Sequence, residues 1–156
     1  MPDWISPNAH NDPDSKWSCE ALAYDENVGT PAFNAAGDNG HFLELYSPYP
    51  VQCSKVRIYA LKFTPPKTYA NANVDIDVYY DDGWHDLFDG LLSTYSNYNE
   101  KTLPAEQIVT AVRIRHNSAS GHFLLAEFDF YGDMAGARAL VGGSLAKGGL
   151  AKKGLV

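Results

Sequence analysis

Apolar and polar positions alternate in short runs along most of the chain. The clearest runs cover residues 42–46, 55–61 and 74–79. Since successive side chains of a strand point to opposite faces of a sheet, period-two alternation predicts strands with one face on a core and the other in water. Pro48 and Pro50 are predicted to end the first of these strands.

The Asp82-Gly83 pair follows the third run and predicts a β-hairpin. Glycine accepts the positive φ that a type I′ turn requires. Alternation returns over residues 108–116, and residues 123–131 form the last predicted strand. The intervening residues 91–107 are polar and aromatic, so we expect a long loop with an edge segment there.

Many short strands without helices predict an all-β fold. No segment of residues 17–132 keeps the 3.6-residue period of a helix, so we expect one β-sandwich or jelly roll over that range. Residues 1–16 hold three prolines and no periodicity, which predicts an extended N-terminal segment. Residues 133–156 are predicted to form an extended C-terminal arm.

Charge divides the chain into an acidic body and a basic tail. All nineteen acidic residues precede residue 134, whereas four of the twelve basic residues lie in residues 134–156. The body therefore has a formal charge of −11 (eight basic against nineteen acidic residues), and the tail has +4. Because phosphate binding requires a basic face, this balance argues against nucleic acid as a partner. The tail is suited to docking on an acidic surface.

The sequence predicts neither a membrane span nor a secretory signal. No apolar run approaches the roughly 18–20 residues of a span, and the N-terminus lacks the basic and apolar regions of a signal peptide. We therefore expect synthesis in the cytoplasm. Cys19 and Cys53 leave two interpretations open: a disulfide, or two buried thiols in strands.

The C-terminal arm carries a five-residue leucine repeat. Its period matches neither a helix nor a strand, and its five glycines from residue 140 onward disfavour a stable helix. We expect an arm whose leucines enter pockets on a partner while its lysines steer it; the alternative is an appendage folded back on its own domain. The predicted partner-binding residues are Leu140, Leu145, Lys147, Leu150, Lys152, Lys153 and Leu155.

Several short motifs occur in an order typical of one family. Residues 23–30 read Ala-Tyr-Asp-Glu-Asn-Val-Gly-Thr, residues 42–45 read Phe-Leu-Glu-Leu, the hairpin reads Asp-Gly-Trp, and residues 126–132 read Ala-Glu-Phe-Asp-Phe-Tyr-Gly. This set resembles discoidin domains, also called coagulation-factor 5/8 C-terminal domains, and family 32 carbohydrate-binding modules. The resemblance covers nearly all of residues 19–132 and implies a discoidin-like (galactose-binding-like) jelly-roll β-sandwich.

The resemblance implies a structural Ca²⁺ in the first motif. The ligands that it suggests are Asp25, Asn27 and Thr30, with Glu127 from the last strand closing the site. Ca²⁺ prefers six to eight oxygen ligands, which such a loop can supply. The alternative is a turn in which Asp25 and Asn27 cap their own backbone. Glu26 stands where the family prefers glycine.

The resemblance also implies a sugar site at one loop end of the β-sandwich. The family holds a galactose-like ligand with an aromatic residue, a histidine, an arginine and an asparagine. Residues 64–66, where the family's arginine falls, contain no arginine. Aromatic faces and planar amides suit a sugar ring, although the same residues can be turn residues without a ligand. The candidate ligand-binding residues are Phe33, Asn34, His41, Asn71, His122 and Phe123.

The sequence contains no catalytic motif, so we expect no enzyme. It lacks a Gly-x-Ser-x-Gly, a Gly-rich phosphate loop and a His-x-x-x-His metal motif. The acidic pairs Asp75/Asp77 and Asp81/Asp82 are expected on the solvated face of a strand and in its turn, not in a glycosidase pair. The other residues expected to bind nothing are His85 and His116, on the hairpin surface, and Trp84, in its packing.

These expectations combine in a hypothesis about function. A glycan-binding type of fold without a signal peptide suggests a bacteriophage structural protein, made in the host cytoplasm and later exposed on the virion. We expect a capsid decoration or a tail or collar component, present in many copies, anchored by residues 134–156 and adhering to host glycans. The alternative is a stand-alone carbohydrate-binding module of cellular origin.

Overall fold

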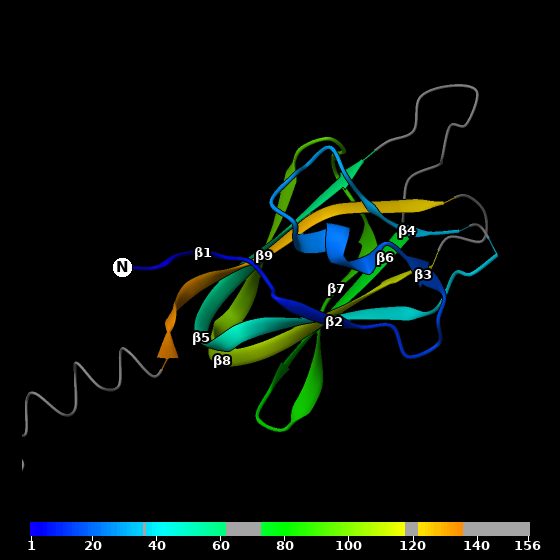
Figure 1. Ribbon diagram of the computed structural model, residues 1–156. Coiled ribbons are helices and arrows are strands. Elements are labelled where there is room, and N and C mark those ends of the chain that lie inside the picture. Colours follow the sequence, from blue (N-terminus) through cyan, green and yellow to red (C-terminus); the bar gives the residue numbers. More distant parts are fainter. Residues whose placement is uncertain (36, 62–72, 118–121, 136–156) are drawn as a thin grey trace, which may run out of the picture.

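Strands make up most of the computed structural model, which describes residues 1–35, 37–61, 73–117 and 122–135 (Figure 1). A short 3-10 helix, η1, packs against them. The elements in chain order are β1 (Asp3–Ile5), β2 (Ala9–Asn11), β3 (Trp17–Ser18), η1 (Glu20–Tyr24), β4 (Ala32–Asn34), β5 (Phe42–Leu61), β6 (Asn73–Tyr80), β7 (Gly83–Leu91), β8 (Tyr98–His116) and β9 (Phe123–Met134).

The strands form one antiparallel sheet that wraps around a core. Its order is β3-β4-β9-β5-β8-β6-β7, with β1 added to β9 and β2 added to β5. The long strands β5 and β8 carry the sheet around the core. The first part of β5 pairs with the end of β8, and the later part of β5 pairs with the start of β8 and with β9. The predicted all-β fold is confirmed.

The core consists of the apolar side chains that alternate along these strands. The predicted inward face of residues 55–61 is confirmed, because Val56, Ile58 and Ala60 are fully buried. The largest apolar side chains that are fully buried come mainly from β5, β6, β8 and β9: Leu43, Leu45, Ile58, Ile76, Ile114, Leu125, Phe128 and Phe130. Burying such side chains is the main favourable contribution to folding.

The two predicted strands at residues 42–46 and 55–61 belong to one strand, β5. Pairing with β8 is interrupted between Tyr46 and Val51, the stretch that contains Pro48 and Pro50. Proline has no N–H group, so it cannot donate to the ladder. The prolines therefore break the pairing without ending the extended chain.

The prediction of a long loop at residues 91–107 is wrong for most of this range. β8 begins at Tyr98, and residues 98–102 pair with residues 55–59 of β5. The buried position here is Asn99, which donates through Nδ2 to the Thr94 carbonyl and accepts from Ser93. A strand whose inward residue is polar carries no apolar alternation, so the sequence pattern could not reveal it.

The β6–β7 hairpin is confirmed, but its turn is displaced by one residue from the prediction. Tyr80 pairs with Gly83, so Asp81 and Asp82 are the two central residues of the turn. Both have positive φ, 49° and 60°. This is the backbone of a type I′ turn, built with aspartates in the left-handed region.

The N-terminal segment is extended, as predicted, and it is part of the sheet. β1 pairs with β9, and β2 pairs with β5. The predicted partner-binding residues of the arm, from Leu140 to Leu155, lie outside the described residues. None of the described helices is long and apolar enough to cross a membrane.

Both cysteines are free thiols. Cys19 is exposed at the start of η1, and Cys53 is buried in β5. Burial raises the pKa of the Cys53 thiol to about 11. The structure therefore contains neither a Cys19–Cys53 disulfide nor two buried thiols in strands.

Candidate functional site

The loop between η1 and β4 contains the turn of the alternative interpretation, because Asp25 and Asn27 accept hydrogen bonds from backbone N–H groups of their own loop. Asp25 accepts from the Asn27 backbone N–H through Oδ1 (3.1 Å) and from the Thr30 hydroxyl through Oδ2 (2.5 Å). Asn27 Oδ1 accepts from the Gly29 N–H at 2.9 Å. Glu26 has a φ of 61°, which lies in the left-handed region that glycine adopts most readily.

Glu127 reaches this loop from β9. Its Oε2 accepts from the Asn27 N–H at 2.9 Å, although the residue is only 2% exposed. Its Oε1 is buried and has no hydrogen-bond partner among the described residues. Burial, followed by the neighbouring Asp129, raises the pKa of the Glu127 carboxyl to about 7.

The structure thus brings all four predicted metal ligands into one cluster. Their side chains offer carboxylate, amide and hydroxyl oxygens, the donor set that Ca²⁺ prefers. A carboxylate oxygen buried without a partner carries a desolvation cost, which a bound cation would offset. The unpartnered Oε1 of Glu127 therefore fits a calcium ion held by Asp25, Asn27, Thr30 and Glu127.

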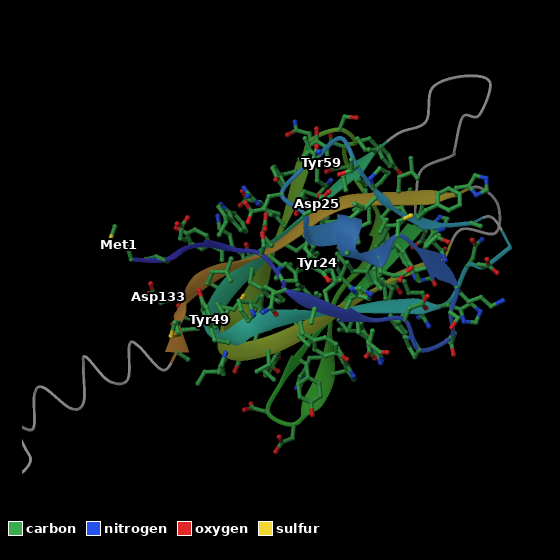
Figure 2. All side chains as sticks on the ribbon, viewed as in Figure 1. Met1, Tyr24, Asp25, Tyr49, Tyr59 and Asp133 are labelled. Atoms are coloured by element: carbon green, nitrogen blue, oxygen red, sulfur yellow. The ribbon has the colours of Figure 1, made fainter. Side chains whose placement is uncertain are left out.

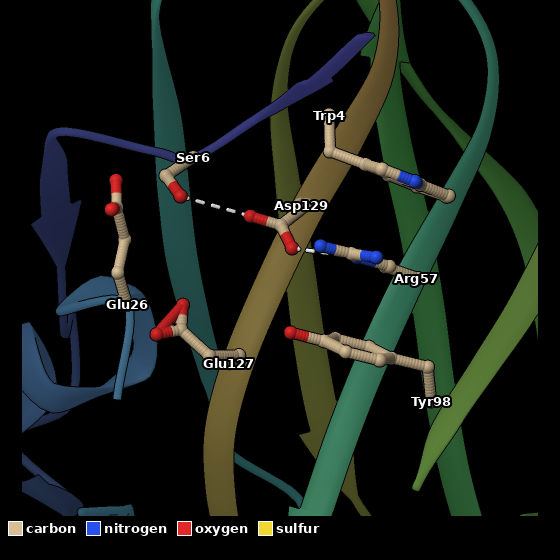
Figure 3. A pocket seen from close by; sticks show the side chains of 7 residues that line it. All are labelled: Trp4, Ser6, Glu26, Arg57, Tyr98, Glu127 and Asp129. Atoms are coloured by element: carbon tan, nitrogen blue, oxygen red, sulfur yellow. Dashed lines mark hydrogen bonds and ion pairs between the residues drawn. The ribbon is translucent and has the colours of Figure 1, made fainter. Parts of the chain in front are cut away.

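A polar pocket of about 270 Å³ opens beside this loop (Figure 3). Glu127 lies at the junction of the pocket and the loop. Arg57 donates through Nε to Asp129 Oδ2 at 2.7 Å, and Ser6 donates to Asp129 Oδ1 at 2.9 Å. The lining residues are Trp4, Ser6, Glu26, Arg57, Tyr98, Glu127 and Asp129.

Arg57 lies between two aromatic rings in this pocket (Figure 3). Its guanidinium carbon is 4.2 Å from the Trp4 ring centroid and 3.8 Å from that of Tyr98. Such cation–π contacts stabilise a partly desolvated guanidinium. Each contact covers one face of its ring, and the pocket also presents the carboxyl groups of Glu26, Glu127 and Asp129.

No pattern in the sequence predicts the Trp4–Arg57–Tyr98 stack. Trp4 comes from the N-terminal segment, Arg57 from β5, and Tyr98 from a region predicted as loop. No local spacing connects residues that lie so far apart in the chain. The one available signal was that Trp4 and Tyr98 are large aromatic residues in polar surroundings.

At the loop end, the structure brings together Phe33 and His122, whose ring centroids are 4.8 Å apart. Both are partly exposed. His41 also belongs to the predicted ligand set, and its Nδ1 lies 2.9 Å from Asp14 Oδ2. Asn71 lies outside the described residues.

The other two predicted ligand residues are buried. Asn34 is fully buried, and its Nδ2 donates to the carbonyls of Lys16 and Asp38. Phe123 is 2% exposed and packs edge-on against Trp17, with a centroid separation of 6.1 Å. Of the predicted ligand residues that the structure describes, Phe33, His41 and His122 are therefore the partly exposed ones.

The outer face of β6 differs from the prediction of a solvated acidic face. Asp75 and Asp77 are only 8% and 7% exposed. They pair with Arg115 at 2.6 Å and with Arg113 at 2.8 Å, so these arginines cover them. Oxygens of Asp75, Asp77 and Asp86 lie within 4.8 Å of one another. Burial, followed by Asp77, raises the pKa of Asp75.

Some of the remaining predictions for the hairpin are confirmed, and one is wrong. Asp81 and Asp82 are exposed in the turn, as predicted. His85 is partly exposed and stacks on Tyr80 at a centroid distance of 3.8 Å. Trp84 packs edge-on against Tyr79, as predicted. The surface position predicted for His116 is wrong, because this ring is 1% exposed and stacks on Phe123 inside the domain.

Comparison with known proteins identifies the fold. No family model matches the chain, and no curated protein matches it. Solved structures do match: the family 32 carbohydrate-binding module of AlyQ in complex with 4,5-unsaturated mannuronic acid has a TM-score of 0.62 at 12% identity, covering 82% of this chain and 97% of that one. This is a discoidin-like fold.

Two further solved structures agree. The family 32 module of Clostridium perfringens NanJ in complex with galactose has a TM-score of 0.59 at 15% identity, covering 84% of this chain and 92% of that one. An F5/8 type C domain from Bacteroides fragilis has a TM-score of 0.57 at 16% identity, covering 84% and 97%. At such identities the likeness concerns the fold of the discoidin-like domain.

Proposed function

We propose that this protein is a non-catalytic module that binds glycans and holds a structural calcium ion in the loop at residues 25–30. The observation that carries the proposal is the discoidin-like fold, shared with modules solved in complex with galactose and with a mannuronic acid derivative. The sequence adds that no catalytic motif is present. Binding is therefore the function that fold and sequence favour together.

The proposed sugar contact is the loop end around Phe33 and His122. An aromatic face can cover the apolar face of a sugar ring, and imidazole nitrogens can exchange hydrogen bonds with its hydroxyl groups. His41 adds a second imidazole to the set exposed at this end. Asn34 and Phe123 act from beneath, because they hold the loops that present these side chains.

Glycan binding is tested on a glycan array, followed by retention on galactose-agarose. We expect the native protein to bind, and Phe33→Ala to weaken retention about tenfold, since truncating an aromatic contact at the centre of a site commonly costs more than about 1 kcal/mol. Leu91→Ala, which removes an apolar side chain that is 56% exposed, is the matched control and should bind like the native protein. A native protein that binds no glycan on the array would sink the proposal.

Calcium binding is tested by thermal melts with CaCl₂ and with EDTA. A ligand at 100 times its Kd stabilises a protein by about 2.7 kcal/mol, so calcium should raise the Tm by several degrees. Glu127→Gln removes the buried carboxylate and should abolish the difference between the two melts. Glu100→Gln, at a strand acid paired with Lys55, is the control and should keep it. Identical native melts in CaCl₂ and EDTA would rule out the ion.

A second proposal concerns the setting in which the module works. We propose that the module belongs to a virion, as a capsid decoration or a tail or collar component in many copies. The support is the sequence of residues 134–156, whose leucines recur every five residues among glycines and four basic residues. A cellular carbohydrate-binding module remains the alternative, and the fold accommodates both.

A further inference from the structure

A row of aromatic side chains crosses the outer face of the sheet. Tyr46 of β5 lies opposite Ala111 of β8, and Ala111 lies opposite Tyr79 of β6. Tyr79 in turn lies opposite Trp84 of β7. Because directly opposed residues of adjacent strands point to the same face, these four side chains form one continuous row.

The small residue in this row leaves a groove. Adjacent strands are roughly 5 Å apart, so Tyr46 and Tyr79 stand roughly 10 Å apart with only the Ala111 methyl group between them. The groove has a volume of about 280 Å³, close to the lower end of the roughly 300–1,000 Å³ typical of ligand pockets. Its described lining residues are Glu44, Tyr46, Tyr79, Trp84, Thr110 and Ala111.

The aromatic walls of the groove are held in place before any ligand arrives. Trp84 packs edge-on against Tyr79 with centroids 5.2 Å apart, and the Arg113 guanidinium lies 4.6 Å from the Trp84 centroid. Tyr46 donates to Glu44 Oε1 at 2.6 Å, and Asn11 donates to the same oxygen at 3.0 Å. Side chains fixed in this way lose little conformational entropy when a ligand binds.

The charges at the groove select the class of ligand. Glu44 alone is charged among the six described lining residues. The arginine above Trp84 is neutralised, because Arg113 donates to Asp77 at 2.8 Å. A negatively charged sugar would therefore meet the Glu44 carboxylate, whose cross-strand neighbour Arg113 is already paired with Asp77. Neutral sugar hydroxyls, in contrast, can donate charge-assisted hydrogen bonds to Glu44.

We propose that this groove is a second glycan-binding surface, which takes a neutral sugar unit between Tyr46 and the Tyr79–Trp84 pair. The apolar face of the sugar ring packs on the aromatic walls, and Glu44 accepts from its hydroxyl groups. The inference rests on the proposed function, that the protein binds glycans. It adds a site on the sheet face whose residues differ from those at the loop end, Phe33 and His122. It predicts a preference for neutral over acidic polysaccharides at this surface.

The test is native affinity electrophoresis in gels that contain galactomannan, xyloglucan, barley β-glucan or polygalacturonate. At least one neutral polysaccharide should slow the migration of the native protein and of Phe33→Ala. Any slowing by polygalacturonate should be the same for the native protein and for the groove variants. Trp84→Ala should weaken this interaction about tenfold or more, the loss expected of a central aromatic contact. Trp84→Phe keeps an aromatic wall and should retain most of it. Ala111→Leu fills the groove without removing a wall, and should weaken binding even if Trp84→Ala fails to fold.

The outcomes separate this inference from the proposed function. If neutral polysaccharides slow Ala111→Leu and Trp84→Ala as much as the native protein, the groove inference is wrong and the proposed function stands. If no polysaccharide slows the native protein, the groove inference is wrong; if the native protein in addition binds no glycan on the array, the proposed function is wrong as well. Retention on an immobilised polyproline peptide with no shift in any polysaccharide gel would overturn the groove inference in favour of a peptide ligand.

Discussion

His116 is the one buried histidine among the described residues, and its burial controls its protonation. The ring is 1% exposed and stacks on Phe123, with a centroid distance of 5.3 Å. Its Nδ1 has no hydrogen-bond partner among the described residues. Burial, followed by the neighbouring His122, lowers the pKa of His116 to about 4. The folded protein therefore holds this imidazole in its neutral form at pH 7.

The lowered pKa of His116 makes stability depend on pH. Between about pH 6.5 and pH 4, the unfolded chain binds a proton at this histidine that the folded protein does not bind. The free energy of unfolding should therefore fall as the pH falls through this interval, by about 3 kcal/mol from this group. His116→Phe should show a smaller fall. Urea unfolding at pH 7, 5.5 and 4.5 measures the difference.

The difference between the pH profiles of the native protein and the variant isolates the contribution of His116 to the free energy of unfolding. Glu127, whose pKa is raised to about 7, changes protonation in an overlapping interval with the opposite effect on stability, but it is present in both proteins. His85→Phe, at a partly exposed ring, is the control and should follow the native profile. If the His116→Phe and native profiles run parallel from pH 7 to 4.5, the neutral buried ring is not a cause of acid sensitivity.

The individual residues of the calcium loop and of the polar pocket beside it were only partly predictable from the sequence. Asp25, Asn27 and Thr30 lie within six positions, and their spacing is a local pattern that a sequence displays. The polar pocket beside them depends on Trp4, Arg57 and Tyr98, which meet only through the pairing of distant strands. A stack of this kind leaves no spacing to read, since each residue is ordinary in its own segment.

At the scale of strands, Gly132 marks a close approach between β9 and β5. It pairs with Cys53 of β5 on one side and with Asp3 of β1 on the other. A Cβ atom at this position would overlap the backbone carbonyl of Gln52. Since a backbone carbonyl cannot swing away as a side chain can, β5 and β9 would have to separate locally to admit any other residue.

Gly132→Ala should therefore destabilise the protein by about 2–3 kcal/mol, the usual range for overpacking that shifts the backbone. Urea unfolding measures the loss. Gly83→Ala is the matched control, because its Cβ would meet nothing nearer than His85 Nε2 at 4.0 Å. Equal stability of the two alanine variants would contradict a close contact between β9 and β5.

The strands that the sequence predicted and those that it missed differ in what they bury. β6 and the end of β8 bury Val74, Ile76 and Ile114, so their alternation appears directly in the sequence. The start of β8 buries Asn99 and carries Glu100, which pairs with Lys55 across the strands at 2.7 Å. Its place in the sheet comes from cross-strand partners, which are invisible until the chain is folded.

At the scale of the whole molecule, β9 connects the two ends of the domain. It begins at Phe123, next to the loop-end residue His122, and it ends at Met134. Twelve strand residues span roughly 40 Å at 3.3 Å per residue. Asp133, near the end of the strand, pairs with the N-terminal amine of Met1 at 3.1 Å (Figure 2). The chain therefore continues into residues 136–156 from the end of the domain opposite the proposed sugar contact.

This separation allows anchoring and sugar binding to be tested independently. A chain of residues 1–135 keeps all of β9 and the whole described core, which runs from Trp17 to Phe130. It should melt within about 2 °C of the full chain and bind the same glycans, because the truncation removes no residue of the described core. Removing residues 136–156 should, however, abolish co-sedimentation with virions, since it removes every leucine of the five-residue repeat.

A full chain with Leu140, Leu145, Leu150 and Leu155 changed to serine keeps the positive charge and should lose co-sedimentation as well. Normal incorporation of the truncated chain into particles would show that the arm is not the anchor, and glycan binding by the sandwich would then stand without it.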